Sequence, residues 1–468
     1  MTSLIMFHLW FITLLAVLPH VSCWIHPIEI AGTHFFDSET QTPFIIKGLD
    51  YQPGGSSGFE GTSDPLSEPT LCARDIILFQ ELGINTVRIY SVNPSLNHDK
   101  CMTMLALAGI YVILDVNTPL PQQHLNRYEP WTTYTSAYLE HVFSVVQEFS
   151  NYNNTLGFFA GNEIINDGKS AQYSPVYIKK LITDIKRYIT HNSKRYIPVG
   201  YSAADDLRYR VSLAKYLECE SAQDSNMDGV DFYGVNSYQW CGEQTLESSG
   251  YDELIDAYRN YTKPVFLSEY GCNRVLPRQF QETEALYSPE MLESFSGGLV
   301  YEFSFESNKY GLVKVNSDES VSILPDFRQL QKVYGESANA IDTTNIPSMD
   351  EQKQASHPPT CDSSYSGLGT GLDYPKTLAK TYIDHGVKAT GGYCELTSQD
   401  MKNMYKIEEE NGDPWTGPTD IKIVASIPSD IIGTQVKERS VKNGANTLQL
   451  GTPLSLLFLA IQVIRNIA

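Results

Sequence analysis

Residues 155–166 read T-L-G-F-F-A-G-N-E-I-I-N, and this stretch decides the fold: a short apolar run leads directly into Asn162 and Glu163. A second run of the same kind, P-V-F-L-S-E-Y-G-C-N at 264–273, leads into Glu269. Continuous apolar runs of this length are typical of buried parallel strands. Either glutamate alone could be a surface charge or a structural ion-pair partner. Because the C-terminal strand ends of a (β/α)8 barrel carry its chemistry, the two together predict a catalytic pair.

The chain on both sides of these runs alternates apolar, β-branched segments with segments of helical periodicity. We therefore expect an α/β protein, a (β/α)8 TIM barrel with a short irregular C-terminal extension. Right-handed crossovers bring Glu163, on the fourth strand, and Glu269, on the seventh, to one face. A lead-in strand is expected at 28–36. Besides the two runs above, the predicted barrel strands are 44–51, 84–90, 110–117, 196–201, 230–238 and 299–303, and the predicted helices are 70–82, 96–108, 134–149, 175–189, 207–217 and 251–261.

Composition narrows the class of ligand. The formal charge of −21 excludes a basic footprint for nucleic acid. The 29 tyrosines and 5 tryptophans suit a neutral, ring-shaped ligand such as a sugar, although most aromatic residues of any barrel belong to its core.

Both ends of the chain resemble targeting signals. Residues 1–23 combine a short apolar run with Val21-Ser22-Cys23, which predicts a cleaved secretory signal peptide, with an uncleaved anchor as the alternative. Residues 436–468 combine small residues, a polar spacer and an apolar tail. That order predicts a glycolipid (GPI) attachment signal with Asn443 as the attachment point, or Ser440 in its place, and a buried C-terminal helix as the alternative. We expect a secreted protein held at the cell surface on the plasma membrane, with the cell wall as a further destination.

Between these signals the composition changes once. Residues 24–335 form the expected catalytic barrel, and 336–360, rich in Ser, Thr, Asp and Pro, are expected to be a linker or strap. Residues 361–435 show no pattern that separates a small accessory module from an irregular tail.

The cysteines and sequons fit a secreted protein. Seven cysteines follow the signal, without a C-x-x-C pair or a histidine cluster, so disulfides are expected and no metal is. The sequons at Asn153 and Asn260 precede predicted strands and so lie at the end of the barrel away from the expected active face.

The pair of glutamates predicts glycoside chemistry. One carboxylic acid must protonate the leaving oxygen, and one carboxylate must attack the anomeric carbon or activate water. Asn162, beside the acid, can bond a sugar hydroxyl, and Arg88, at the end of the second strand, can keep Glu269 ionised. This chemistry needs no cofactor.

The motifs also resemble a known family. The segments K-G-L-D-Y-Q-P-G-G at 47–55, L-G-F-F-A-G-N-E at 156–163, V-N-S-Y-Q-W-C-G at 235–242 and V-F-L-S-E-Y-G-C-N at 265–273 are similar to those of glycoside hydrolase family 72, the β-1,3-glucanosyltransferases of fungal cell walls, which are commonly GPI-anchored. The resemblance covers about residues 28 to 330.

The resemblance implies a retaining enzyme that cuts a β-1,3-glucan internally and transfers the new reducing end to another β-1,3-glucan chain. Glu163 matches the family's acid/base and Glu269 its nucleophile. Tyr90, Asn162, Tyr238 and Tyr301 match residues that line the glucan cleft, and Asp205 borders it with less certainty. Cys72 with Cys101 and Cys241 with Cys272 match family disulfides, and Cys219 would pair with Cys361 or Cys394. Donor and acceptor glucan chains are the expected partners, and a monomer is expected.

Two other functions use the same residues. An endohydrolase of β-1,3-glucan would resolve the intermediate with water instead of sugar. An inactive wall glucan-binding protein is the non-enzyme alternative, and the presence of both glutamates and Arg88 argues against it.

Overall fold

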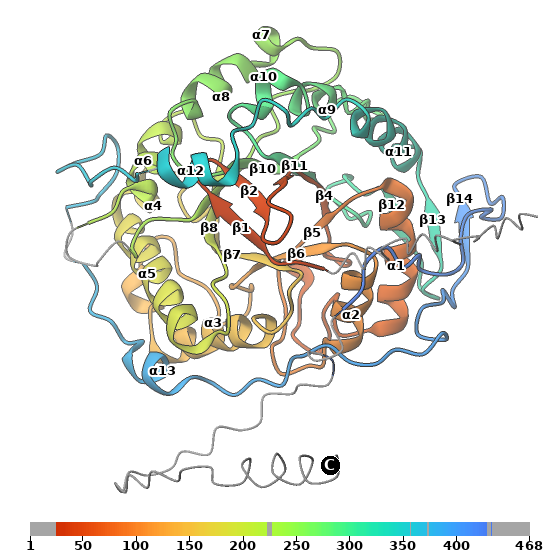
Figure 1. The fold of residues 1–468 in the computed structure, drawn as a ribbon, viewed down its shortest axis with the longest axis horizontal. Helices are drawn as coiled ribbons and strands as arrows, with labels where there is room; N and C mark the ends of the chain where they lie inside the picture. Colours follow the sequence, from red (N-terminus) through yellow and green to blue (C-terminus); the bar gives the residue numbers. More distant parts are fainter. Residues whose placement is uncertain (1–24, 222–226, 356, 372–373, 428–431, 433–468) are drawn as a thin grey trace, which may run out of the picture. The chain divides into compact units, whose positions relative to one another are not determined.

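The computed structural model describes residues 25–221, 227–355, 357–371, 374–427 and 432. Eight parallel strands form a closed barrel in the order β10-β11-β4-β5-β6-β7-β8-β9, which confirms the predicted fold (Figure 1). The barrel strands are β4 (Ile46–Asp50), β5 (Thr86–Ile89), β6 (Tyr111–Asp115), β7 (Thr155–Asn162), β8 (Val199–Ala204), β9 (Phe232–Asn236), β10 (Val265–Tyr270) and β11 (Gly297–Val300).

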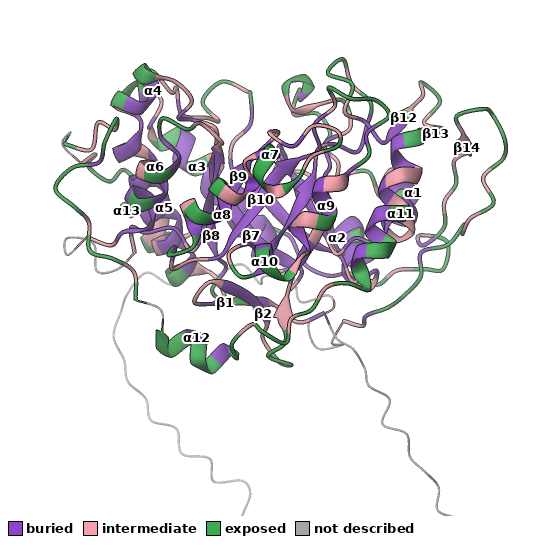
Figure 2. Cartoon of the chain, turned by 90° about the horizontal axis from the view of Figure 1, so that it is seen from above, coloured by how far each residue is buried: buried purple, intermediate pink, exposed green. Residues whose placement is uncertain are grey.

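The strands form because both of their faces are covered. Every residue of β5, β6, β9, β10 and β11 is buried. Figure 2 shows buried strands, β9 and β10 among them, at the centre of the molecule. Their continuous apolar composition suits that position. The register pairs Asp50 with Arg88 across β4 and β5, and Asn236 with Glu269 across β9 and β10. Polar residues from different strands are thereby brought to one end of the barrel.

Helices cover the outside of the barrel (Figure 1). α1 begins at Pro69 and stops at Gly83, whose φ of 64° a residue with a Cβ disfavours. Thr135 caps α3 by accepting from the Tyr138 N–H, and Asp167 caps α4 by accepting from the Ser170 N–H. The helices are α1 (Pro69–Leu82), α2 (Asp99–Leu107), α3 (Ser136–Phe149), α4 (Gly168–Tyr173), α5 (Pro175–Asn192), α6 (Arg210–Glu218), α7 (Leu246–Ser249), α8 (Tyr251–Tyr258), α9 (Gln281–Leu286), α10 (Pro289–Leu292), α11 (Pro325–Ala338), α12 (Met349–Ala355) and α13 (Lys380–His385).

A small antiparallel sheet closes the N-terminal end of the barrel, where one lead-in strand was predicted. β1 (Ile28–Ala31), β2 (His34–Asp37) and β3 (Pro43–Phe44) form this sheet. The prediction of one strand over 28–36 is wrong because Gly32, at φ 56°, turns the chain back on itself. Phe35 then packs against Phe232 and Phe266, at 6.0 Å between ring centroids in both contacts, and closes the bottom of the core.

Several predicted barrel strands also begin one to three residues later than expected, the first and the fifth among them. Phe44 belongs to β3, so the first barrel strand starts at Ile46. The fifth starts at Val199, and not at residue 196, since Pro198 has no N–H to donate to a neighbouring strand.

The C-terminal segment lies along the outside of the barrel. β12 (Val313–Val315), β13 (Val321–Ile323) and β14 (Ile407–Glu409) form a three-stranded sheet. Glu148 of α3 accepts from the N–H groups of Thr390 and Gly391, at 3.2 and 3.0 Å. Residues 361–427, where described, are therefore attached to the barrel surface by hydrogen bonds of their backbone, and also by the hydroxyl of Tyr393, which donates to Asn154 at 2.7 Å.

The predicted targeting signals lie outside the described residues. This applies to residues 1–23, to 436–468 and to Asn443. Within the described part of the chain, no helix has the length and apolar character needed to cross a bilayer.

Candidate active site

Polar and aromatic side chains gather at the C-terminal ends of the barrel strands. Glu269 lies in β10, and Glu163 follows β7 directly. The two are close enough for the charge of Glu163 to raise the pKa of Glu269. The strand order places β8 and β9 between them, as a fourth and seventh strand of a barrel require.

Three donors converge on the Glu269 carboxylate. Tyr90 Oη donates to Oε1 at 2.8 Å, Tyr238 Oη donates to Oε2 at 2.7 Å, and Arg88 Nη1 lies 3.3 Å from Oε1. Burial has the largest effect on the pKa of Glu269 and raises it, as does the charge of Glu163, whereas Arg88 and the two tyrosine hydrogen bonds lower it. Together these effects raise the pKa of Glu269 to about 7. An ionised carboxylate only accepts hydrogen bonds, whereas a protonated carboxyl group also carries an O–H donor, so a set made only of donors suits the ionised form that a nucleophile needs.

The Arg88 side chain is held in place by contacts other than the one with Glu269. The guanidinium is fully buried and makes a bidentate pair with Asp115, at 3.1 Å from Nε and 3.0 Å from Nη2. Its carbon lies 4.3 Å from the ring centroid of Tyr90 and 4.7 Å from that of Phe159. The Arg88 guanidinium therefore contacts Glu269 in an orientation that its contacts with Asp115 and the two rings already fix.

Asp50 is a further acidic residue close to Arg88, Asp115 and Glu269. It is fully buried, and neither of its carboxyl oxygens has a hydrogen-bond partner among the described residues. Burial raises the pKa of Asp50 well above its usual range, although Arg88 opposes this. Burial therefore favours the uncharged form of Asp50, while Arg88 pairs with both Asp115 and Glu269.

Glu163 has a different environment. Its side chain is half-buried, its backbone has a φ of 46°, and its N–H donates to Ser202 O at 2.9 Å. Asn236 Nδ2 donates to Glu163 Oε1 at 2.8 Å and to Asn162 Oδ1 at 3.0 Å. Among the described residues, no cation pairs with Glu163. Glu163 therefore receives a single neutral side-chain donor, whereas Glu269 receives a cation and two hydroxyls.

Tyrosines crowd the β9 and β11 side of the pair. The ring centroids of Tyr238, Tyr301 and Tyr310 are 5.2 to 6.3 Å from one another, with edge-to-face geometry. Tyr301 and Tyr310 are half-buried, so parts of both rings face solvent. Such rings offer apolar surface next to Glu269 for a sugar ring.

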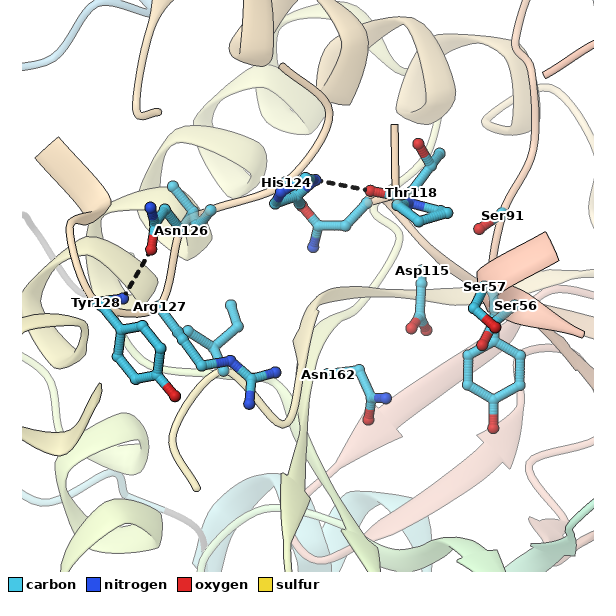
Figure 3. A pocket seen from close by; sticks show the side chains of 15 residues that line it. Ser56, Ser57, Ser91, Asp115, Thr118, His124, Asn126, Arg127, Tyr128 and Asn162 are labelled. Carbon is cyan, nitrogen blue, oxygen red and sulfur yellow. Dashed lines mark hydrogen bonds between the residues drawn. The ribbon is translucent and has the colours of Figure 1, made fainter. Parts of the chain in front are cut away.

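A cavity of about 660 Å³ opens on the β6 and β7 side (Figure 3). Tyr90, Asp115 and Asn162 line its catalytic end. The loop between β6 and α3 supplies most of the remaining wall. A pair of carboxyl groups with tyrosines on one side and a polar cavity on the other can bind a chain that passes through the site.

The other predicted residues lie in several places. Asp205 pairs with Arg210 Nε at 2.6 Å and accepts from Ser237 Oγ at 2.8 Å, so its carboxylate is already engaged. Of the two sequons, Asn260 is exposed, whereas Asn153 is half-buried and its amide donates to Ile25 O at 3.3 Å.

Three disulfides are formed between the described cysteines, in agreement with the resemblance. They join Cys72 to Cys101, Cys241 to Cys272, and Cys219 to Cys361, across 142 residues in the last case. Of the two partners left open for Cys219, the structure selects Cys361, and Cys394 is a free thiol beside Thr103.

Sequence reasoning missed Asp115, Asn236 and Tyr310. Asp115 and Asn236 are the last residues of β6 and β9, and each lies near the C-terminal end of a predicted strand, as Glu269 does; this shared position was the available signal. Tyr310 lies in a loop, where no periodicity marks it.

Comparison with known proteins places these features in context. The model of a family described as Glucanosyltransferase matches residues 19–338. The chain is 56% identical to the 1,3-beta-glucanosyltransferase GAS4 of Saccharomyces cerevisiae, over 88% of this chain and 87% of that protein. It is 45% identical to the 1,3-beta-glucanosyltransferase gel2 of Aspergillus fumigatus, over 87% of this chain and 85% of that protein. A solved structure of Saccharomyces cerevisiae Gas2p in complex with laminaritriose and laminaritetraose aligns with a TM-score of 0.67 and 39% identity, over 75% of this chain and 77% of that one.

Proposed function

Because the chain belongs to the glucanosyltransferase family, glycoside hydrolase family 72, we propose that it is a retaining 1,3-β-glucanosyltransferase. It cleaves a β-1,3-glucan internally and transfers the new reducing end to another β-1,3-glucan chain, as cell-wall elongation requires. One observation carries the proposal: Glu269 receives three donors, whereas Glu163 receives one neutral amide. This asymmetry supports Glu269 as the nucleophile and Glu163 as the acid/base.

In the first step Glu269 attacks the anomeric carbon of the donor chain. The bond from its carboxylate oxygen to that carbon forms while the glycosidic bond breaks, and Glu163 gives its proton to the leaving oxygen. The released fragment departs with that proton, and a covalent glycosyl-enzyme remains on Glu269.

In the second step a hydroxyl of the acceptor chain attacks the same carbon. Glu163, now ionised, takes the hydroxyl proton, the bond to Glu269 breaks, and the new glycosidic bond has the configuration of the original one. Both carboxyl groups thereby return to their starting protonation states.

Transfer competes with hydrolysis at this second step. Bulk water is present at about 55 M, but a bound hydroxyl in attack geometry can reach an effective molarity of about 10⁵ M or more. The rings of Tyr301 and Tyr310 beside Glu269 supply a surface that can hold the acceptor in that geometry. This supports transfer as the outcome.

The test is incubation with a borohydride-reduced laminari-oligosaccharide followed by sizing of the products. Transfer yields products longer than the donor, at a share that increases with oligosaccharide concentration. Products shorter than the donor at every concentration would make the protein an endohydrolase instead. No product of either kind would favour the inactive glucan-binding alternative.

We also propose that the enzyme is a monomer on the cell surface, held at the plasma membrane by a lipid on Asn443. The order of residues in 436–468 supports this proposal. A chain truncated before Ser440 should be released into the medium in active form. Retention of that truncated chain on membranes would contradict the lipid anchor, and gel filtration of the released enzyme tests the monomer.

A further inference from the structure

A buried arginine joins the loops that carry Tyr301 and Tyr310, and the catalytic steps do not use it. Arg278 lies between β10 and α9, and only 1% of its surface is exposed. Its Nη1 donates to Tyr301 O at 2.6 Å and to Gly271 O at 3.3 Å, and its Nη2 donates to Tyr310 O. One guanidinium therefore connects the chain after β10, the chain after β11 and the loop before β12.

Asp326 fixes the Nε end of the same guanidinium. It lies in the first turn of α11, and its Oδ2 accepts from Arg278 Nε at 2.7 Å. Its Oδ1 accepts from the backbone N–H of Arg278 at 3.2 Å. The guanidinium carbon also lies 4.7 Å from the ring centroid of Phe280. The planar group is thus bound at both ends, an arrangement that the single ammonium of a lysine does not reproduce.

The two tyrosine carbonyls that Arg278 binds belong to the rings beside the nucleophile. The ring centroids of Tyr301 and Tyr310 lie 5.2 Å apart, and both residues are half-buried. Tyr310 belongs to no helix or strand, and the Glu302 N–H lies at the long distance of 3.5 Å from its carbonyl oxygen. The bonds from Arg278 to both carbonyls therefore tie the Tyr310 backbone to that of Tyr301.

We propose that Arg278 is a positioning residue for the transfer step, which sets the relative placement of the Tyr301 and Tyr310 rings and thereby the placement of the acceptor chain. The proposal rests on the glucanosyltransferase function, because an acceptor has to be held only if a sugar attacks the intermediate. Among the described residues, no hydrogen bond or ion pair joins Arg278 to Glu163 or Glu269, so the first step does not depend on it. The second step does, since a misplacement of about 1 Å can cost about a hundredfold in rate.

The ratio of transfer products to hydrolysis products tests this role. Arg278→Lys keeps a positive charge beside Asp326, but one ammonium does not replace the bonds to both tyrosine carbonyls. With reduced laminari-oligosaccharides, the ratio should fall about tenfold at each acceptor concentration. The acceptor concentration for half-maximal transfer should rise, while the rate of donor cleavage stays within about twofold of the wild type. A merely structural role would lower both products by one factor, through the folded fraction, and leave the ratio unchanged.

Arg74→Lys is the matched control. Like Arg278, Arg74 is 1% exposed, pairs through Nε with an aspartate, Asp75, at 2.7 Å, and donates from Nη1 to a backbone carbonyl, Glu319 O, at 2.6 Å. It lies in α1, and its described contacts do not include Tyr301. Arg74→Lys should lower the melting temperature and leave the ratio of transfer to hydrolysis unchanged.

Asp326→Asn gives a second measurement if Arg278→Lys folds poorly. It leaves the arginine in place and weakens the bond that fixes its Nε end, so the ratio should fall by a smaller factor than in Arg278→Lys. Thermal melting of each variant shows whether the measured enzyme is folded.

An unchanged ratio in both Arg278→Lys and Asp326→Asn, in a wild type that transfers, would overturn the positioning role and leave the transferase function intact. An equally large fall in Arg74→Lys would also overturn it, because any buried arginine would then have the same effect. A wild type that yields only hydrolysis products at every acceptor concentration would reject the transferase function, and the role of Arg278 with it.

Discussion

Asn236 and Glu163 are joined by a hydrogen bond of 2.8 Å from the Asn236 amide to the Glu163 carboxyl. The opposite end of that amide accepts from Ser202 Oγ at 3.0 Å and from Ser268 Oγ at 2.8 Å, so the amide cannot rotate. Asn236 is also the strand partner of Glu269. One buried side chain thus connects the Glu163 carboxyl group with the strand that pairs with Glu269.

We expect Asn236→Ala to lower kcat by about ten- to a hundredfold, because Glu163 loses the donor that orients it. Asn236→Asp should cost more, since a second carboxyl beside Glu163 replaces a donor with an acceptor. Steady-state kinetics with reduced laminari-oligosaccharides, together with thermal melting, would check both. A variant that melts like the wild type and retains full kcat would show that Asn236 does not position Glu163.

Glu163→Gln and Glu269→Gln should each reduce turnover below about one part in a hundred while the fold is kept. Each change removes one protonation state that the two steps require, and leaves the shape of the side chain nearly unchanged. Product sizing measures turnover, and circular dichroism with thermal melting checks the fold. Residual activity above that level in either variant contradicts the role assigned to that glutamate.

The pH dependence of kcat/KM should report the ionisation of Glu269. Burial raises the pKa of Glu269 to about 7, and the hydrogen bond from Tyr90 lowers it. Activity should therefore fall as the pH decreases through this range, because the nucleophile gains a proton. Tyr90→Phe removes a donor to the charged form, so the pKa should rise and the acid limb should move to higher pH, by about one unit.

Tyr310→Phe is the matched control for this shift. Tyr310 belongs to the same group of rings, and no hydrogen bond joins it to Glu269. The acid limb of the kcat/KM profile of Tyr310→Phe should lie at the same pH as that of the wild type. An unmoved limb in Tyr90→Phe would mean that Tyr90 does not tune Glu269.

The stability of the protein should decrease at alkaline pH because of His98. This histidine is buried between Asp64, 3.0 Å from Nε2, and Glu148, 3.1 Å from Nδ1. Burial alone would lower the pKa of His98, but its hydrogen bonds to the two carboxylates raise it to about 9 from an ordinary 6.5. The stabilisation, about 3 kcal/mol, is complete below pH 6.5 and is lost as the pH rises through 9.

Thermal melting from pH 6 to pH 10 measures this loss. His98→Gln should melt at a lower temperature than the wild type at pH 6. Its melting temperature should then decrease much less than that of the wild type between pH 6 and pH 9. Substitution of the exposed His191 by Gln should leave the wild-type pH dependence intact. If His98→Gln shows the same pH dependence of the melting temperature as the wild type, other groups cause the loss of stability at alkaline pH.

The sequence predicted the barrel, and the position of Glu163 and Glu269 at one end of it, because both depend on local pattern. Apolar runs such as 155–162 and 265–270 identify buried strands, and a carboxylate at the end of each identifies the face that carries the chemistry. The roles of Asp115 and Asn236 depend instead on register between neighbouring strands. A single strand does not reveal that Asn236 faces Glu163, or that Arg88 binds Asp115 more closely than Glu269.

Loops were predicted less well for a related reason. Gly32 turns the lead-in segment into a hairpin through one left-handed residue, which leaves the alternation of the flanking side chains almost unchanged. The segment after residue 361 is held by backbone N–H groups that donate to Glu148 and Asp99, and by single side chains such as Tyr393, whose ring lies 5.3 Å from that of Tyr152. Neither kind of contact produces a periodic pattern in the segment. Such contacts become visible only when both partners are placed.

The balance between transfer and hydrolysis should depend on Tyr301. Its ring contacts those of Tyr238 and Tyr310, and its Oη accepts from Asn308 at 3.2 Å. It makes no hydrogen bond to Glu269 in the described structure. Tyr238, in contrast, donates directly to Glu269, so Tyr238→Ala should impair cleavage as well as transfer.

Tyr301→Ala should therefore lower the yield of elongated products more than the rate of donor cleavage, and raise the share of hydrolysis products. The covalent intermediate still forms on Glu269, but the acceptor loses a surface that held its hydroxyl in attack geometry, so water competes better. Products would be sized at several acceptor concentrations for the wild type, Tyr301→Ala and Tyr301→Phe, with Tyr301→Phe expected to keep transfer because it keeps the ring. If Tyr301→Ala lowers cleavage and transfer by the same factor at every acceptor concentration, Tyr301 serves the first step, and the acceptor is held elsewhere in the cleft.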